Sequence, residues 1–325
     1  MLASRAAWLY HAGGLTQADV AARLGVTAAK AHRLIARAAR DGLVRVYVEG
    51  PLAGCLALEH RLCERFALGM ARVVPDLGEG GLPLAALGPA GGSFLLDALE
   101  RGVHRVIGIG HGRTLAAAVD RLPRMDAPGT CLVSILGGVT RRTGAGPFDV
   151  ITRLAEKTTA EAWLLPVPFY ADSAADRPVL ARQRAVVRGL ALAAGASLFV
   201  FGIGEVTENA FLHRAGLISE GDVVALRRAG AVGEALGRFV DADGRIVRTR
   251  LHDRVVALEP AAMTGRSAVA IAGGPGKADA IAAVLRSGIA TGLITDERTA
   301  SAMLERADAA PPVRRARRGK REEWA

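Results

Sequence analysis

The sequence predicts an α/β protein in which a small helix-turn-helix module precedes a larger, Rossmann-like domain with a mainly parallel sheet. Two observations support this prediction. Residues 15–46 show a short helix, a glycine turn, a second helix and an alternating strand. From about residue 70 to residue 306, apolar runs alternate with helical stretches, as in a parallel sheet covered on both faces. With 325 residues, 50% of them hydrophobic, the chain is long enough for both parts.

The module is expected to begin with a helix over residues 17–24. Its inward side chains are Val20, Ala21 and Leu24. Gly25 can adopt the left-handed conformation of a tight turn without steric cost, and Thr27 can cap the second helix. In that helix, apolar side chains recur at the i, i+3, i+4, i+7 spacing of a buried stripe. They are Ala31, Leu34, Ile35 and Ala38.

Small and basic side chains face outward at the start of the second helix. Because such side chains can reach base edges and phosphates in the major groove, this segment is predicted to be a recognition helix. The candidate DNA-contacting residues are Gln17, Thr27, Ala28, Ala29, Lys30, His32, Arg33 and Arg37. The alternative is an ordinary helical hairpin at the end of an enzyme. Residues 44–48 alternate like a strand behind the helix, so the module is expected to be winged.

Positive charge is concentrated at the two ends of the chain. Residues 1–50 hold seven Lys or Arg against three acidic residues, and residues 309–325 hold six against two, whereas the long middle is nearly neutral. This distribution is expected if the ends meet a polyanion such as double-stranded DNA. The tail offers nothing from which to build a core, so we expect it to be disordered, with a specific DNA contact as the alternative.

Membrane and metal functions are not indicated. No segment resembles a signal peptide and no run of ~20 apolar residues occurs, so we expect a cytoplasmic protein without a membrane partner. The three cysteines, Cys55, Cys63 and Cys131, show no metal-site spacing, and the seven histidines include no HExxH pair. A metal site is therefore not expected.

The larger domain is expected to follow a linker near residues 50–51 and to start with an amphipathic helix over residues 56–68. Apolar runs predict strands at residues 71–75, 104–110, 131–138, 162–168, 197–204, 267–274 and 292–296. Helices are expected near residues 82–101, from 114, near 148–161, at 178–194, after 274 and after 296.

Four of these strands end in glycines: GIGHG, LGG, FGIG and AGG. In an open α/β sheet, ligands bind outside the carboxyl ends of the strands, where glycine permits close backbone approach and the next helix offers free N–H groups. A single Gly-Gly pair is as readily a tight turn. Repetition of the pattern at equivalent strand ends predicts that the four loops converge on one small ligand.

Two segments match nucleotide-binding motifs only in part. Gly108 and Gly110 open a GxGxxG frame, but its third glycine position holds Arg113 and no acidic residue follows at the position that reads a ribose. GGPGK at residues 273–277 lacks Walker A spacing. What remains is a glycine loop, helix N-terminal amides and Lys277, which suit sugar hydroxyls or a phosphate. We therefore expect no cofactor.

Over about residues 5–306, the chain resembles the SorC/DeoR-type bacterial transcriptional regulators. The matching segments are GLTQADVAARLGVT, VIGIGHGRTL, FGIG followed by FLHRAGLIS, GAVGEALGRFVDADGRIV and AGGPGKADAIAAVLRSGIATGLITDERTA. The resemblance implies a DNA-binding regulator of a carbohydrate or polyol catabolic operon, controlled by a sugar, sugar phosphate or polyol and assembled as a homodimer or homotetramer. It also implies a sugar-binding domain similar in fold to sugar-phosphate isomerases and glucosamine-phosphate deaminase.

The resemblance divides the chain into a DNA-binding domain (1–50), an effector-binding and oligomerisation domain (51–308) and a basic tail (309–325). Residue by residue, it places effector contacts at Gly110, His111, Gly112, Arg113, Thr114, Gly137, Gly138, Gly204, Glu205, Glu234, Asp241 and Lys277. Lys277 and Arg113 lean toward a phosphate, and Asp241 is equally well a turn residue of the DADG segment. The alternative function is a sugar-phosphate isomerase or deaminase, with Asp241, Glu205 or His111 as its acid or base.

Overall fold

The computed structural model describes residues 1–44, 53–138 and 150–308. The chain forms two compact units, the first built mainly from Met1–Pro51 and the second from most of the remaining chain. Nearly all of the strand expected at residues 44–48, the linker at 50–51 and the basic tail at 309–325 lie outside the described residues. The wing therefore stays a prediction.

The first unit is a helical module. Its elements are α1 (Leu2–Ala7), the π-helical turn η1 (Trp8–Ala12), α2 (Gln17–Leu24) and α3 (Ala28–Arg40). Gly25 takes the left-handed conformation (φ +63°) between α2 and α3, and the Thr27 hydroxyl accepts a hydrogen bond from the Lys30 N–H at 3.3 Å. The expected turn and cap are thus confirmed.

A second cap, at the start of α2, was not expected. The Thr16 hydroxyl accepts from the Asp19 N–H, and the Asp19 carboxylate accepts from the Thr16 N–H, both at 3.2 Å. This reciprocal capping box satisfies backbone donors that the helix itself leaves free. Val20, Ala21, Ala31 and Ile35 are buried as expected.

The second unit is built on a seven-stranded sheet in the order β1-β10-β9-β5-β2-β3-β4, with every neighbouring pair parallel. Its strands are β1 (Met70–Val74), β2 (Val106–Ile109), β3 (Cys131–Ser134), β4 (Glu161–Trp163), β5 (Leu198–Phe201), β9 (Ser267–Ile271) and β10 (Gly292–Asp296). The expected α/β fold with a mainly parallel sheet is confirmed.

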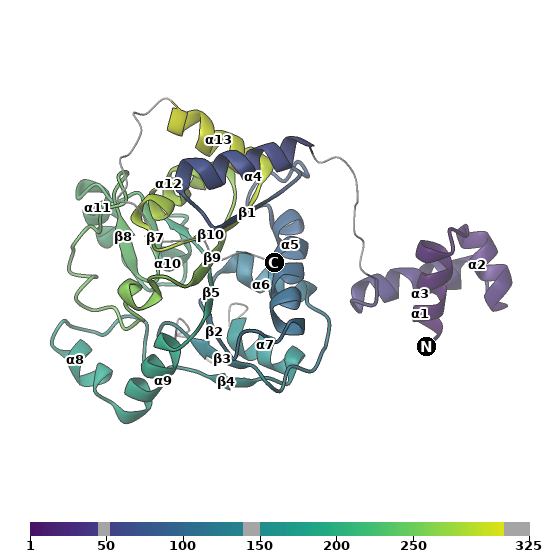
Figure 1. Ribbon diagram of the computed structural model, residues 1–325, viewed down its shortest axis with the longest axis horizontal. Helices are drawn as coiled ribbons and strands as arrows, with labels where there is room; N and C mark the ends of the chain where they lie inside the picture. The colour runs from purple at the N-terminus through teal and green to yellow at the C-terminus, as the bar shows by residue number, and fades with distance from the viewer. Residues whose placement is uncertain (45–52, 139–149, 309–325) are drawn as a thin grey trace. The chain divides into compact units, whose positions relative to one another are not determined.

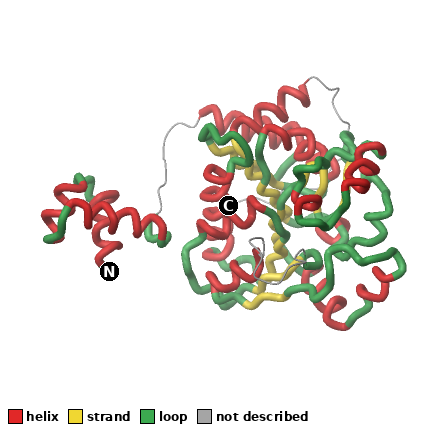
Figure 2. The backbone as a smooth tube through the Cα atoms, turned by 180° about the vertical axis from the view of Figure 1, so that it is seen from behind, coloured by secondary structure: helices red, strands yellow, loops and turns green. Residues whose placement is uncertain are grey.

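Helices cover both faces of this sheet (Figures 1 and 2). On one face lie α5 (Leu84–Glu100), α6 (Arg113–Arg121) and α7 (Val150–Thr158), and on the other α4 (Ala53–Phe66), α9 (Arg184–Ala194), α12 (Ala278–Ser287) and α13 (Glu297–Asp308). Right-handed crossovers explain the division, because the chain crosses the sheet in one direction from β1 to β4 and returns from β4 to β10. No helix among the described residues combines the length and apolarity needed to cross a bilayer.

Two expected elements differ from the structure. The single helix expected over residues 178–194 is interrupted, because Gln183 leaves the helical conformation (ψ +134°) between α8 (Asp176–Ala181) and α9. The strand expected over residues 162–168 is only β4. Pro166 and Pro168 have no backbone N–H with which to extend the ladder.

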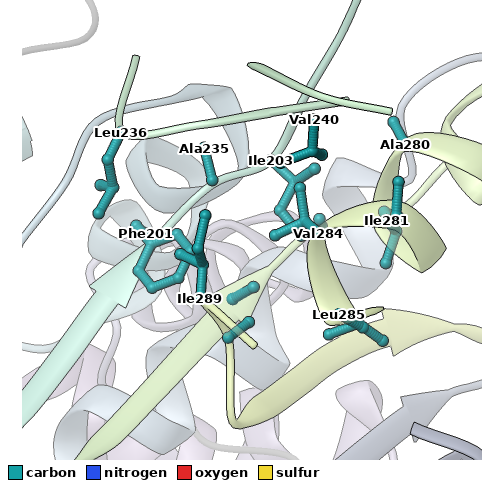
Figure 3. Close-up of a cluster of buried hydrophobic side chains, with 14 of the residues drawn as sticks. Phe201, Ile203, Ala235, Leu236, Val240, Ala280, Ile281, Val284, Leu285 and Ile289 are labelled. Carbon is teal, nitrogen blue, oxygen red and sulfur yellow. The ribbon is translucent and has the colours of Figure 1, made fainter. Parts of the chain in front are cut away.

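A small antiparallel sheet was not expected from the sequence. It consists of β6 (Gly204–Glu205), β7 (Gly233–Ala235) and β8 (Arg238–Val240), and it is accompanied by α10 (Phe211–Arg214) and α11 (Glu220–Arg228). Leu236 and Gly237, with φ of +54° and +74°, form the two-residue turn between β7 and β8. Phe201, Ile203 and Leu236 belong to one buried cluster with side chains of α12 (Figure 3), so the small sheet is anchored in the core.

Candidate functional site

A pocket lies at the carboxyl edge of the parallel sheet, with ≈ 490 Å³ of space between its walls when the part open to solvent is included. It is bounded by the segments that follow the neighbouring strands β2 and β5. After β2 the chain continues on one face of the sheet, and after β5 it continues on the opposite face. The space between such strands is the topological switch point, where open α/β sheets bind ligands.

The structure brings all four expected loops to this pocket. Residues 111–114 follow β2, Leu136 follows β3, residues 201–204 end β5, and Lys277 lies in η3 (Pro275–Lys277) after β9. Glu234, on β7, completes the polar lining. Of the expected effector residues, those that line the pocket are His111, Gly112, Arg113, Thr114, Gly204, Glu234 and Lys277.

Three expected glycines serve packing instead of lining the pocket. A Cβ on Gly110 would lie 2.7 Å from the Cβ of Phe201, and one on Gly137 would lie 2.5 Å from the carbonyl oxygen of Pro168. Gly138 pairs with Pro168 in an isolated parallel bridge and borders a separate hollow. Gly110 and Gly137 require glycine because the chain approaches its neighbours closely there, whereas a Cβ on Gly138 would lie 3.7 Å from the Val167 carbonyl oxygen, an ordinary contact.

Asp241 also lies outside the pocket lining. Its Oδ1 accepts hydrogen bonds from the N–H groups of Asp243 (3.0 Å) and Arg245 (2.8 Å). Of its two interpretations, the turn residue accounts for these contacts, and the effector contact does not.

Lys277 and Glu205 form an ion pair beside the pocket. The Lys277 Nζ lies 2.9 Å from Glu205 Oε2 and donates to the Ile203 carbonyl at 2.7 Å, and the two side chains are 12% and 14% exposed. The charge of Lys277 is therefore already balanced within the protein. This weakens the expectation that Lys277 favours a phosphate.

The backbone loop that carries Lys277 is held by a buried pair on the next strand and helix. The N–H of Gly274 (φ +108°) donates to Asp296 Oδ2 at 3.1 Å and to the Thr299 hydroxyl at 2.7 Å. The Thr299 hydroxyl in turn donates to Asp296 at 2.6 Å. Asp296 and Thr299 thus hold the backbone of the loop that carries Lys277.

Glu234 is a buried acid whose ionisation is poised near neutrality. Burial raises its pKa to about 7, against the lowering effects of the hydrogen bond from the Gly237 N–H and of the nearby Lys277. A Cβ at Gly204 would lie 2.6 Å from Glu234 Oε2, so glycine at that position leaves room for the carboxyl group. Near pH 7 Glu234 can either donate to or accept from a ligand hydroxyl.

His111 is the other unusual group of the pocket. Both ring nitrogens are buried and have no hydrogen-bond partner among the described residues. The ring lies edge-on to Phe169, with centroids 5.3 Å apart, and tilted against Phe211 at 5.1 Å. Burial lowers the pKa of His111 to about 4, so the imidazole is neutral at physiological pH.

A third polar feature is the start of α6. The first N–H groups of a helix have no intrahelical acceptor and favour anions or hydroxyl oxygens. Arg113 is the first residue of this helix, and the Thr114 hydroxyl donates to the Ile271 carbonyl at 2.6 Å, which ties the helix start to β9. The pocket therefore offers two kinds of polar groups: the start of α6 with Arg113, which suits an anion, and the side chains of Glu234 and His111, which suit hydroxyl groups.

In the first unit, most of the expected DNA-contacting side chains of α3 are exposed. They are Ala28, Ala29, Lys30, His32, Arg33 and Arg37. Thr27 caps the helix, Arg37 forms an exposed ion pair with Asp41 (3.2 Å), and Gln17 Oε1 lies 3.3 Å from the His32 ring. This face of α3 presents the small and basic surface that a recognition helix needs.

The residues proposed as an acid or base for an enzyme are not assembled into a catalytic group. Asp241 is held in its own turn and Glu205 is paired with Lys277. No group among the described residues makes a hydrogen bond that would orient the His111 ring. Within the described parts of the chain, no cluster of three or more His, Cys, Asp or Glu side chains suits a metal ion.

Comparisons with protein families match both units. The family model described as "Putative sugar-binding domain" matches residues 50–305, and the model of the MarR family matches residues 6–51. The chain is 48% identical over 303 residues to the erythritol catabolism regulatory protein EryD of Brucella abortus, covering 93% of this chain and 96% of the relative. It is 35% identical to the transcriptional regulator LsrR of an Enterobacter species, covering 93% of this chain and 92% of that protein.

Solved structures of transcriptional regulators are similar to this chain as well. The full-length sorbitol operon regulator SorC of Klebsiella pneumoniae is similar with a TM-score of 0.72 and 25% identity, over 93% of this chain and 98% of that one. A DeoR family transcriptional regulator of Listeria monocytogenes shares the fold, with a TM-score of 0.68 and 20% identity over 77% of this chain and 99% of that one. These relatives are transcriptional regulators, which decides against the isomerase or deaminase alternative.

Proposed function

Because the chain belongs to the SorC/DeoR-type family of bacterial transcriptional regulators, we propose that it controls genes of polyol or carbohydrate catabolism in response to a small polyhydroxylated effector. The relative with 48% identity is named for erythritol catabolism, and a structural neighbour for the sorbitol operon. Both names favour a polyol over other ligands of the pocket. Erythritol and its phosphate are the first candidates.

The observation that supports this proposal best is the composition of the switch-point pocket. Glu234 and His111 offer donors and acceptors to hydroxyl groups, and the apolar side chains Leu136, Phe201 and Leu236 face the carbon skeleton. Lys277 is neutralised by Glu205. A phosphoryl group would therefore be expected to bind Arg113 and the first N–H groups of α6.

The first unit supports the proposed binding of double-stranded operator DNA. We expect the start of α3 to enter the major groove, with Lys30 and Arg33 near phosphates and base edges. A homodimer or homotetramer would present two or more copies of α3 to a pseudo-palindromic operator. Such a regulator acts in the cytoplasm.

Regulation requires that the effector bind the DNA-competent and DNA-incompetent states with different affinities. A coupling free energy of ~2 kcal/mol would change operator affinity about thirtyfold. Without such a difference, effector binding would leave transcription unchanged.

The test is a thermal-shift screen of the full chain against polyols, sugars and their phosphates, followed by analysis of each ligand after incubation. A ligand at 100 times its Kd stabilises the protein by about 2.7 kcal/mol. We expect a polyol or its phosphate to raise the Tm and to be recovered unchanged. Conversion of the ligand would favour an enzyme, and a complete absence of shifts would contradict the assignment of the pocket.

A further inference from the structure

His111 is the group in the pocket whose hydrogen-bonding capacity is left unused. Within the parts of the chain that the structure describes, its two buried ring nitrogens have no hydrogen-bond partner, whereas Glu234 accepts from Gly237 and Lys277 is paired. An unpaired buried polar group destabilises a fold, and native proteins rarely retain one without a ligand or water to satisfy it. Phe169 and Phe211 cover two sides of the ring and offer no such partner. His111 is also one of the residues that line the pocket, so a ligand bound there is the candidate partner for the ring.

We propose that His111 determines the specificity of the pocket by hydrogen-bonding one hydroxyl group of the effector, at an end of the ligand that carries no phosphoryl group. This inference rests on the proposed function, since it requires a polyhydroxylated effector. It adds the residue that reads the hydroxyl and the orientation of the ligand.

The chemistry follows from the neutral state of the ring. A neutral imidazole presents one donor and one acceptor, and a hydroxyl group can satisfy either of them. A phosphoryl dianion offers only acceptors, so it could accept from the ring N–H but could not donate to the other ring nitrogen. Protonation of the ring would remove this conflict, but burial lowers the pKa of His111 to about 4. Arg113 and the start of α6 are the better environment for an anionic end.

The experiment compares His111→Phe with the wild-type full chain, using erythritol and two triols that each lack one of its hydroxyls, butane-1,2,3-triol and butane-1,2,4-triol. Phenylalanine preserves the aromatic packing and removes both ring nitrogens. By calorimetry, we expect His111→Phe to bind erythritol about tenfold to a hundredfold more weakly than the wild type. For one of the triols, the Kd values of the two proteins should agree within about twofold, because that triol lacks the hydroxyl group to which His111 hydrogen-bonds.

Two further variants separate this role from a structural one. His111→Asn keeps a donor and an acceptor and should retain part of the preference for erythritol over that triol. The matched control is His104→Phe, because His104 precedes β2 and its ring pairs with the Ser197 hydroxyl at 2.8 Å outside the pocket. It should leave all affinities unchanged. The Tm of His111→Phe should not fall, since the substitution removes an unpaired buried polar group.

The outcomes distinguish this inference from the proposed function. If the wild type binds no polyol, no sugar and no phosphate of either, the proposed function fails. If the wild type binds erythritol and His111→Phe binds it equally well, the proposed function stands and the role of His111 is refuted. Equal losses for erythritol and both triols would also refute it, because the ring would then act through shape alone.

Discussion

Replacing Lys277 by methionine tests whether the ion pair beside the pocket holds the site together. Methionine keeps most of the side-chain volume but removes the charge 2.9 Å from Glu205 Oε2 and the hydrogen bond to the Ile203 carbonyl. Breaking a buried ion pair by removing one partner costs about 3–5 kcal/mol, because the other charge stays unpaired. Glu205 is 14% exposed, so water partly solvates the carboxylate that stays behind, and we expect a loss of about 2–3 kcal/mol.

This loss should be visible in thermal unfolding. In a unit of this size, 1 kcal/mol shifts the Tm by about 2–4 °C, so Lys277→Met should melt roughly 5–10 °C below the wild type at pH 7. The double variant Lys277→Met/Glu205→Gln should recover part of the loss, since it also removes the unpaired carboxylate. Effector affinity should fall in the single variant. An unchanged Tm would show that the ion pair does not stabilise the protein. The same would follow if adding Glu205→Gln to Lys277→Met lowered the Tm as much as Glu205→Gln alone lowers it in the wild type.

Three other changes test separate parts of the account. Arg33→Ala should weaken operator binding and lower the slope of log K against log salt by about 1, with effector affinity unchanged in calorimetry; equal losses in both assays would contradict this. Because burial raises the pKa of Glu234 from 4.5 to about 7, the native state holds this proton more tightly than the unfolded chain, and the wild type should lose up to about 3 kcal/mol through Glu234 as pH rises across that window. Glu234→Gln should lack this loss in urea unfolding, and identical pH profiles would contradict the assignment. Thr16→Ala removes the capping box with Asp19 and should destabilise the first unit by ~1 kcal/mol in thermal unfolding; no change would show that the cap is not stabilising.

The sequence predicted the elements that have strong periodicity or definite turn chemistry. Gly25 and Thr27 located the turn and the cap of the helix pair, and apolar runs located the strands of the parallel sheet. Because the carboxyl ends of parallel strands meet at one edge, the glycines after four strands also predicted where the pocket lies. The strand-end pattern does not distinguish glycines that line the pocket from glycines that are needed for close packing elsewhere. Gly110 and Gly137 are required by close approaches to Phe201 and Pro168, which are remote in sequence.

The small antiparallel sheet shows the limit of pattern reasoning. Strands of two or three residues, such as β6 and β7, are too short to display a period, yet they position Glu205 and Glu234. The pairing of Glu205 with Lys277 and the unpaired ring of His111 depend on contacts across more than fifty residues of chain. No local signal in the sequence reports them. Only the assembled fold shows that Lys277 is neutralised and that His111 lacks a partner.

If the chain is an effector-controlled regulator, a ligand of the pocket must change the affinity of the first unit for DNA. The most direct measurement selects DNA from a random-sequence pool with the full chain and then titrates that DNA by fluorescence anisotropy, with and without erythritol or its phosphate. We expect one of these ligands to change the Kd for DNA at least tenfold, while Lys277→Met responds only at higher ligand concentration. A ligand that raises the Tm but leaves the Kd for DNA unchanged would contradict the claim.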